Sequence, residues 1–331
     1  LFAFSLNDFS NLIFNILLSL IMLVLAFVIF GNGNQLLIVS LFMIRLFGVF
    51  LIDQAKSEVR GFHNNKKFGQ IEIYSNILLL VSAVFSAYFF GVKGYIFSLC
   101  LSPFVVLFFH RFRISFDRTL FKNFTEKSFW KFCVTMAFTN QVSELIFLLD
   151  VFFIGIFLDN SAVAHYRIYS IIPFNLFFLA ALFFQTAYPK LCENHQNNQY
   201  QLQFLFNFWK LMVPITILIF AVSYFGAEYI LTLFGNDYAE NPKVFKILIV
   251  ASISVLLLRT PFGYLLASKG KSIYNLIAAL ISILSLLVLI KPTISNFGIE
   301  GVAWLSLVNL FFIGIFQMIS YFYLVYRAPK L

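Results

Sequence analysis

Long apolar runs separated by short polar breaks dominate the pattern along this chain. An apolar helix of about 20 residues, rising 1.5 Å per residue, crosses a hydrocarbon core of about 30 Å. A membrane β-barrel would instead alternate apolar and polar residues over segments of roughly ten residues. The pattern therefore predicts an all-α polytopic membrane protein with about ten spans, near 11–30, 35–52, 71–90, 94–110, 131–158, 162–189, 205–226, 243–267, 271–290 and 297–326.

The composition supports this class and narrows the choice of partners. Apolar residues make up 61% of the 331 residues and charged residues 11%, which is more apolar surface than a soluble domain could hide. The net charge of +9 fits basic cytoplasmic loops beside anionic membrane lipid, so nucleic acid is not an expected partner. The three cysteines and four histidines follow no metal-binding or redox spacing, so we expect no metal and no cofactor.

The distribution of Lys and Arg predicts the orientation of the spans. With ten alternating spans, sixteen of the twenty-three basic residues fall on one side, four fall on the other, and Arg45, Arg167 and Arg259 lie within spans. Basic residues are enriched in cytoplasmic loops, so this bias predicts that both ends of the chain are cytoplasmic. The longest connection, 111–130, is basic and rich in Phe. It fits either an amphipathic helix on the inner leaflet or a solvated linker.

Short motifs recur on the two sides of this linker. The sequence FGVKG at 90–94 returns as FGIEG at 297–301, and Arg45-Leu46-Phe47-Gly48 returns as Arg-Thr-Pro-Phe-Gly at 259–263 with one extra residue. The basic residues lie on the same side in both copies, which indicates a parallel repeat. We therefore expect an N-terminal lobe of four spans at 1–110 and a C-terminal lobe of six at 131–331. The first lobe is expected to be incomplete, lacking the counterpart of the first two spans of the second.

The central hairpin at 131–189 carries polar residues within its apolar runs. A polar side chain facing lipid would have no hydrogen-bond partner, so we expect these residues to face protein or a water-filled cavity. They include Asn140, Gln141, Glu144, Asp150, His165 and Arg167.

Several motifs resemble those of one transporter superfamily. They are DVFFIG at 150–155, Ala164-His165-Tyr166, YPKL at 188–191 and LFGNDY at 233–238. Through them the chain resembles the O-antigen and capsule repeat-unit flippases of the multidrug/oligosaccharidyl-lipid/polysaccharide exporter superfamily, although members commonly have Gly at the position of His165.

The resemblance implies a transporter rather than an enzyme, with a MATE-like fold of two lobes in the bacterial cytoplasmic membrane. Such a protein flips a polyprenyl-diphosphate-linked oligosaccharide by alternating access. It works beside a polysaccharide polymerase and chain-length proteins.

The embedded arginines suit such an anionic substrate. A bare cation at mid-membrane depth costs at least about 2.5–3.5 kcal/mol on insertion scales, and guanidinium binds phosphate oxygens bidentately. Arg45, Arg259 and Arg167 are therefore candidate substrate-binding residues, together with Asn140 and Gln141. Alternatively each arginine pairs with a carboxylate or with backbone carbonyls, and Arg167 could extend to the membrane surface.

Two carboxylates are candidates for coupling transport to H⁺ or Na⁺. A buried carboxylate can exchange a proton, and both Glu144 and Asp150 lie within an apolar run. Alternatively, Asp150 pairs with Arg167 or caps its helix.

The sequence is also compatible with other functions. A drug or cation antiporter of the same superfamily would be expected to centre on carboxylates, and a peptidoglycan-precursor flippase is a further neighbour. A membrane oligosaccharide polymerase or glycosyltransferase would be expected to carry a large external loop or an acidic metal motif, which the chain does not show. It also shows no glycine-rich phosphate loop of an ATP-driven pump.

Overall fold

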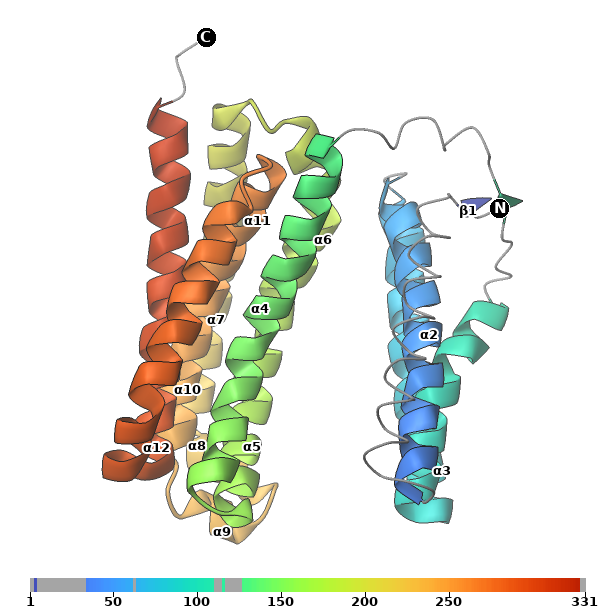
Figure 1. Cartoon of the computed structure of the whole chain (residues 1–331), viewed down its shortest axis with the longest axis vertical. Helices are drawn as coiled ribbons and strands as arrows, with labels where there is room; N and C mark the ends of the chain where they lie inside the picture. The colour runs from blue at the N-terminus through green and yellow to red at the C-terminus, as the bar shows by residue number, and fades with distance from the viewer. Residues whose placement is uncertain (1–2, 5–33, 62–63, 110–114, 117–126, 328–331) are drawn as a thin grey trace. The chain divides into compact units, whose positions relative to one another are not determined.

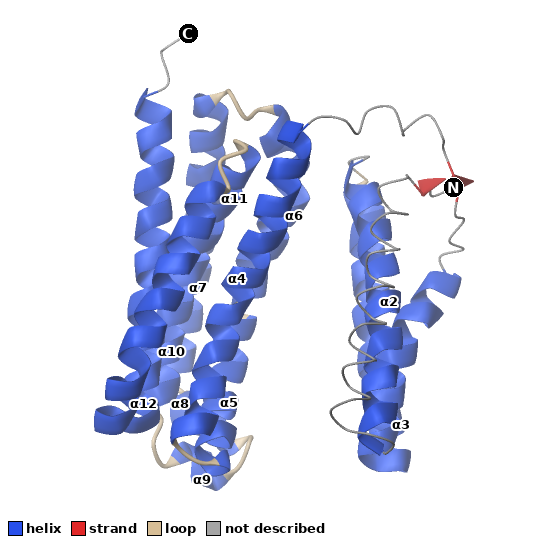
Figure 2. Ribbon diagram, in the orientation of Figure 1, coloured by secondary structure: helices blue, strands red, loops and turns tan. Residues whose placement is uncertain are grey.

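The computed structural model describes residues 3–4, 34–61, 64–109, 115–116 and 127–327, which are almost entirely helical (Figures 1 and 2). The chain divides into two compact units, Leu1–Glu126 and Lys127–Leu331. The division falls within the stretch 111–130 that separates the two expected lobes. Most of this stretch lies outside the described residues, so the choice between an amphipathic helix and a solvated linker stays a prediction.

Two long helices make up most of the described part of the first unit. Helix α2 spans Asn34–Gly61 and packs along α3, which spans Asn65–Phe109. A two-residue parallel pair joins β1 at Ala3–Phe4 to β2 at Ser115–Phe116, so these two residues of the linker are extended rather than helical. The buried apolar side chains between the helices are Ile52, Val59, Phe68, Ile71, Val106 and Leu107.

The second unit is a bundle built around α12. Its elements are α4 (Lys127–Phe157), α5 (Asn160–Asn175), α6 (Phe177–Glu193), α7 (Asn198–Phe225), α8 (Ala227–Thr232), α9 (Asn236–Ala239), α10 (Lys243–Ser254), the π-helical turn η2 (Val255–Arg259), α11 (Thr260–Ser268) and α12 (Ile273–Arg327). Helix α12 packs against α4, α10, η2 and α11. The Asp159 side chain accepts a hydrogen bond from the backbone N–H of Ala162 at 2.7 Å and so caps α5, which confirms the predicted break between α4 and α5.

Two glycines break long helices in the same way. Gly91 in α3 has φ 61° and ψ −148°, and Gly298 in α12 has φ 57° and ψ −141°. A side chain disfavours positive φ, so glycine is the residue suited to these positions. Each glycine is the second residue of one copy of the recurring FG motif, so both copies fold alike, as a repeat predicts.

The described helices match the predicted spans closely. Seven are long and apolar enough to cross a membrane, and two of these, α3 and α12, each have two arms joined at a glycine. They account for nine of the ten predicted spans, while the span predicted at 11–30 lies outside the described residues. Several boundaries were wrong. Helix α2 continues to Gly61 instead of ending near 52, α3 begins at Asn65 instead of near 71, and α7 begins at Asn198 instead of near 205. The break expected at 291–296 falls at Gly298.

Close contact between α2 and α3 at Gly48 generates a first prediction. A Cβ added at Gly48 would lie 2.8 Å from Pro103 Cβ and 2.9 Å from the Phe104 ring, whereas a Cβ at Gly69 would meet nothing within 4 Å. Gly48→Ala should therefore destabilise the protein by about 1–3 kcal/mol through overpacking. Gly69→Ala, the matched control inside α3, should stabilise it by about 0.5–1 kcal/mol. Thermal unfolding in detergent measures both, and equal melting temperatures for the two variants would contradict the close packing.

Candidate functional site

Helix α4 presents a polar face that its own unit leaves uncovered. Asn140, Gln141 and Glu144 are exposed, while Thr139 and Val142 beside them are buried. Asn140 and Glu144 are four residues apart and therefore lie on one side of the helix. This part of α4 belongs to a stretch that is long and apolar enough to cross a membrane. Polar groups at such a depth need water, protein or a ligand as partners.

Arg259 lies against this face. It is the last residue of η2 and is partly buried, and its guanidinium carbon lies 5.2 Å from the centroid of the Phe147 ring. Phe147 is three residues after Glu144 on α4, and the Glu144 carboxylate also acts electrostatically on Arg259. Among the described residues, however, Arg259 forms no ion pair within 4.0 Å. The guanidinium thus has an aromatic neighbour and a nearby carboxylate, and its N–H donors form no ion pair.

The other two candidate arginines lie on other helices. Arg45 is partly buried on α2 of the first unit, where it acts electrostatically on Cys100 of α3. Arg167 is exposed on α5. The structure therefore brings Arg259 together with Phe147 and Glu144 of α4, whereas Arg167 lies exposed on α5.

Asp150 is the most deeply buried carboxylate among the described residues, with 1% of its surface exposed. Tyr166 donates a hydrogen bond from its hydroxyl to Asp150 Oδ2 at 3.1 Å, and the Ser306 hydroxyl donates to the same oxygen. Its partners are therefore two hydroxyl groups, and the possible pairing with Arg167 is wrong. The other carboxylate oxygen, Oδ1, is buried and has no hydrogen-bond partner among the described residues.

Other buried polar atoms without a hydrogen-bond partner lie at the same level of the bundle. Ser282 Oγ and Asn309 Nδ2 are also buried without a hydrogen-bond partner in the described residues. Ile146, Ala278 and Ile313 belong to one apolar cluster formed by α4 and the two arms of α12. About one helical turn separates each unpartnered residue from a member of that cluster: Asp150 from Ile146, Ser282 from Ala278, and Asn309 from Ile313. In each case the unpartnered residue lies nearer the end of the bundle that holds Gly298.

The unpartnered oxygen of Asp150 can hold a proton, a small cation or water, because a carboxylate oxygen accepts hydrogen bonds and binds cations. In the described parts of the chain, no group of three His, Cys, Asp or Glu side chains is placed so that it could hold a metal ion.

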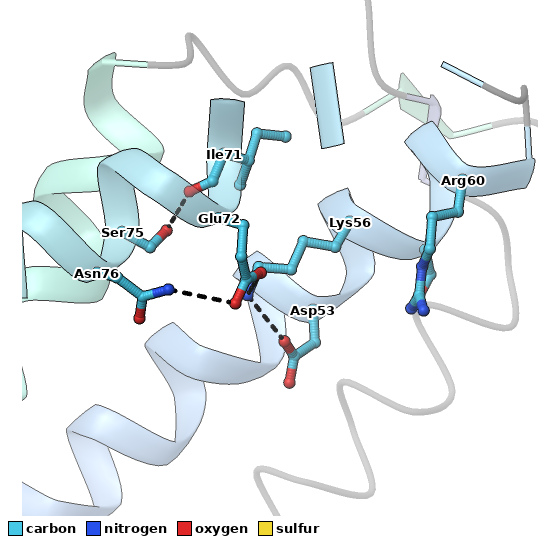
Figure 3. A network of polar contacts seen from close by, with 8 residues as sticks. Asp53, Lys56, Arg60, Ile71, Glu72, Ser75 and Asn76 are labelled. Atoms are coloured by element: carbon cyan, nitrogen blue, oxygen red, sulfur yellow. Dashed lines mark hydrogen bonds and ion pairs between the residues drawn. The ribbon is translucent and has the colours of Figure 1, made fainter. Parts of the chain in front are cut away.

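A second polar network lies in the first unit and is shown in Figure 3. Lys56 Nζ lies 2.6 Å from Glu72 Oε2 and 3.8 Å from Asp53 Oδ1, and Asn76 donates to Glu72 Oε1 at 3.4 Å. The network joins α2 to α3. Its lysine is neutralised by its carboxylate neighbours, so it stabilises the pair of helices rather than offering a free charge. Sequence reasoning missed this network because it placed Lys56 in a loop.

Lys269 also serves the fold. It lies between α11 and α12 and donates from Nζ to the His195 carbonyl at 2.9 Å and to Asn198 Oδ1 at 2.7 Å. Burial lowers the pKa of this lysine below its ordinary value, since desolvation disfavours the charged form. Lys269, one of the sixteen basic residues on the predicted cytoplasmic side, therefore connects the turn before α7 to the turn before α12.

His165, where the resemblance leads us to expect glycine, contacts two tyrosine rings. Its ring lies 4.9 Å from that of Tyr238 on α9 and 6.1 Å from that of Tyr169, centroid to centroid. The larger side chain fills space between α5 and α9.

Comparisons with known proteins show the fold. No family model matches the sequence, and no curated protein matches it. The crystal structure of the Vibrio cholerae MATE transporter VcmN, in a mutant form, superposes with a TM-score of 0.76 at 15% identity over 98% of this chain and 79% of that one. The bent form of VcmN gives 0.72 at 16% identity, over 96% and 77% of the two chains.

A MOP superfamily transporter from Pyrococcus furiosus, described as having a binding pocket of reverse polarity, gives a TM-score of 0.68 at 16% identity over 97% and 77% of the two chains. These similarities confirm the predicted fold class, an all-helical membrane protein with a MATE-like fold.

The hydroxyl groups around Asp150 generate a second prediction. Tyr166→Phe removes a buried donor from the carboxylate and should destabilise the protein by about 1–3 kcal/mol. Tyr229→Phe makes the same chemical change at a side chain that is 81% exposed and should have little effect. Thermal unfolding of the two variants in detergent tests the contact, and a Tyr166→Phe variant as stable as Tyr229→Phe would rule it out.

Proposed function

We propose that this chain is a transporter of the MOP superfamily that flips a polyprenyl-diphosphate-linked oligosaccharide across the bacterial cytoplasmic membrane by alternating access. The observation that carries the proposal is Arg259, a cation in a membrane-spanning stretch that lies beside the exposed polar face of α4 and forms no ion pair in the described residues. A diphosphate would supply the missing anion.

The surroundings of Arg259 favour an anion that binds and leaves. Phe147 stabilises the positive charge through its ring, an interaction worth about 0.5–2 kcal/mol, without occupying the N–H donors. Glu144 attracts the guanidinium but forms no ion pair with it within 4.0 Å. A phosphate can therefore take up N–H groups that the protein leaves available, and Glu144 compensates the charge of Arg259 when no ligand is bound.

The neighbouring amides suit the sugar part of the substrate. Asn140 and Gln141 are exposed beside Glu144, and their amide groups both donate and accept hydrogen bonds, as sugar hydroxyls require. In the Pyrococcus furiosus transporter of the same fold, a pocket of reverse polarity suggests a different function. An arginine-centred site would likewise distinguish this chain from exporters of cationic drugs.

Asp150 is the stronger of the two candidates for ion coupling. It is buried with one oxygen unpartnered, and Ser282 and Asn309 contribute further unpartnered atoms at its level of the bundle. Glu144 is exposed beside Arg259 and is better suited to balancing that charge. In this proposal H⁺ or Na⁺ binds at Asp150, while substrate binds at the α4 face.

Neutralising the arginines tests the substrate class. In a flippase-deficient bacterium supplied with the matching sugar-synthesis genes, Arg259→Ala and Arg45→Ala should each reduce surface polysaccharide about 10- to 100-fold. The reduction follows from the loss of a charged hydrogen bond worth roughly 1.5–3 kcal/mol. Lipid-linked repeat units should accumulate on the cytoplasmic leaflet, and Arg259→Lys should retain part of the activity.

Lys210→Ala is the matched control, because Lys210 is an exposed cation on α7 with no role in the proposed site. It should transport normally at equal expression. Normal transport by an Arg45→Ala/Arg259→Ala double variant would overturn the anion-binding site, and export of cationic dyes without polymer would instead support a drug antiporter.

The two carboxylates should differ in energy coupling. In proteoliposomes, Asp150→Asn should remove the dependence of transport on an imposed H⁺ or Na⁺ gradient. Glu144→Gln should keep that dependence, although the charge of Arg259 is then no longer balanced by a nearby carboxylate. Substrate flux with and without each gradient is the measurement. Gradient-driven transport by Asp150→Asn at the parental rate would exclude Asp150 as the coupling group.

A further inference from the structure

The helix that carries Arg259 is not α-helical at that residue. Between α10 and α11, η2 is π-helical, and the Thr260 N–H bonds to the Val255 carbonyl five residues earlier instead of four. A π-turn holds more residues than an α-turn, and such turns are frequent at functional sites. The turn ends at Arg259, the candidate ligand-binding cation.

Pro261 provides a local cause for the wide turn. In an α-helix the Leu257 carbonyl would accept from the N–H of residue 261, but proline has none and its ring clashes with that carbonyl. The indole of Trp209, on α7, takes over this role and donates to the Leu257 carbonyl at 2.9 Å. The proline opens the turn, and the tryptophan satisfies the carbonyl that the proline cannot bond.

Helix α12 fits closely against the wide turn at Gly314. A Cβ at this position would lie 2.8 Å from Leu258 Cβ and 3.2 Å from the Arg259 nitrogen. The backbone of α12 therefore lies against η2, in addition to the hydrogen bond that Trp209 makes from α7.

The first copy of the repeat has neither the proline nor the π-turn. Arg45-Leu46-Phe47-Gly48 contains no proline, and α2 is α-helical through it, whereas the second copy has Pro261 and one more residue between the arginine and the glycine. Arg45 therefore lies in an α-helical segment, whereas Arg259 lies at the end of a π-turn.

We propose that Pro261 and Trp209 are positioning residues, which hold the π-turn so that the Arg259 guanidinium lies on Phe147 and faces an anionic ligand. The inference rests on the proposed function for the identity of the ligand. An α-helix turns about 100° per residue, so closing the wide turn would rotate Arg259 relative to α10 and move its side chain away from Phe147. Pro261 and Trp209 act through Arg259 and touch no substrate.

A stability cycle tests the backbone arrangement. Trp209→Phe should lower the melting temperature of the parent protein, because the Leu257 carbonyl loses its donor. In a Pro261→Ala background the same change should have little effect, since the substituted alanine supplies a backbone N–H to that carbonyl. Equal losses of melting temperature in both backgrounds would overturn the inference.

The reactivity of Arg259 tests the positioning. Phenylglyoxal modifies accessible arginines, and mass spectrometry gives the rate at Arg259 in the purified protein. Pro261→Ala should change this rate several-fold and remove the protection that inorganic pyrophosphate gives, at an unchanged or higher melting temperature. Pro292→Ala, a proline replacement within α12, should behave like the parent. Parental reactivity and protection in Pro261→Ala would overturn the inference.

This experiment distinguishes failure of the proposed anionic ligand from failure of the proposed positioning by the π-turn. If pyrophosphate does not protect Arg259 even in the parent protein, the anionic ligand of the proposed function is wrong. A several-fold change of phenylglyoxal reactivity in Pro261→Ala would still establish that the π-turn positions the side chain.

Discussion

In the hydrocarbon core of a membrane, every polar group needs a partner from the protein, from trapped water or from a ligand. The described structure meets this constraint at one site after another. Lys56 pairs with Glu72, and the hydroxyls of Tyr166 and Ser306 serve one oxygen of Asp150. Even the carbonyl left open by a proline accepts a hydrogen bond, from Trp209. Groups that depart from this pattern in the described residues include one buried oxygen of Asp150, which has no hydrogen-bond partner, and Arg259, which has an aromatic neighbour but no ion pair. The proposed function starts from the arginine.

Much of the fold follows from the sequence because apolar run length and glycine placement act locally. The run at 131–158 became α4, Asp159 caps the next helix, and the two FG motifs mark the two breaks in long helices. The errors have physical causes. Helix α2 extends past its apolar run because the Lys56–Glu72 contact with α3 stabilises a charged segment as helix. The Lys291-Pro292 pair suggests a turn, yet α12 continues through it to Gly298, where the backbone adopts positive φ.

The site was predictable only in part, because its contacts join distant residues. Glu144, Asp150 and Arg259 stand out as charges within apolar runs. Nothing local to Asp150 indicates Ser306, which lies 156 residues away on another helix, and Phe147 is one of forty-seven phenylalanines. Arg167 seemed a natural partner for Asp150 by charge, but it is exposed on α5 while the carboxylate is buried. The π-turn at Arg259 likewise contacts α7 and α12, which are distant in sequence, and Pro261 is its one local signal.

Direct binding of a lipid diphosphate tests the central claim, that Arg259 is held for an anionic ligand. Native mass spectrometry of the purified protein, mixed with undecaprenyl diphosphate and with the cationic dye ethidium in competition, measures which one binds. We predict a diphosphate adduct on the parent protein that is lost in Arg259→Ala and retained in Lys210→Ala. Binding of ethidium alone, or a diphosphate adduct of equal strength on Arg259→Ala, would contradict the account.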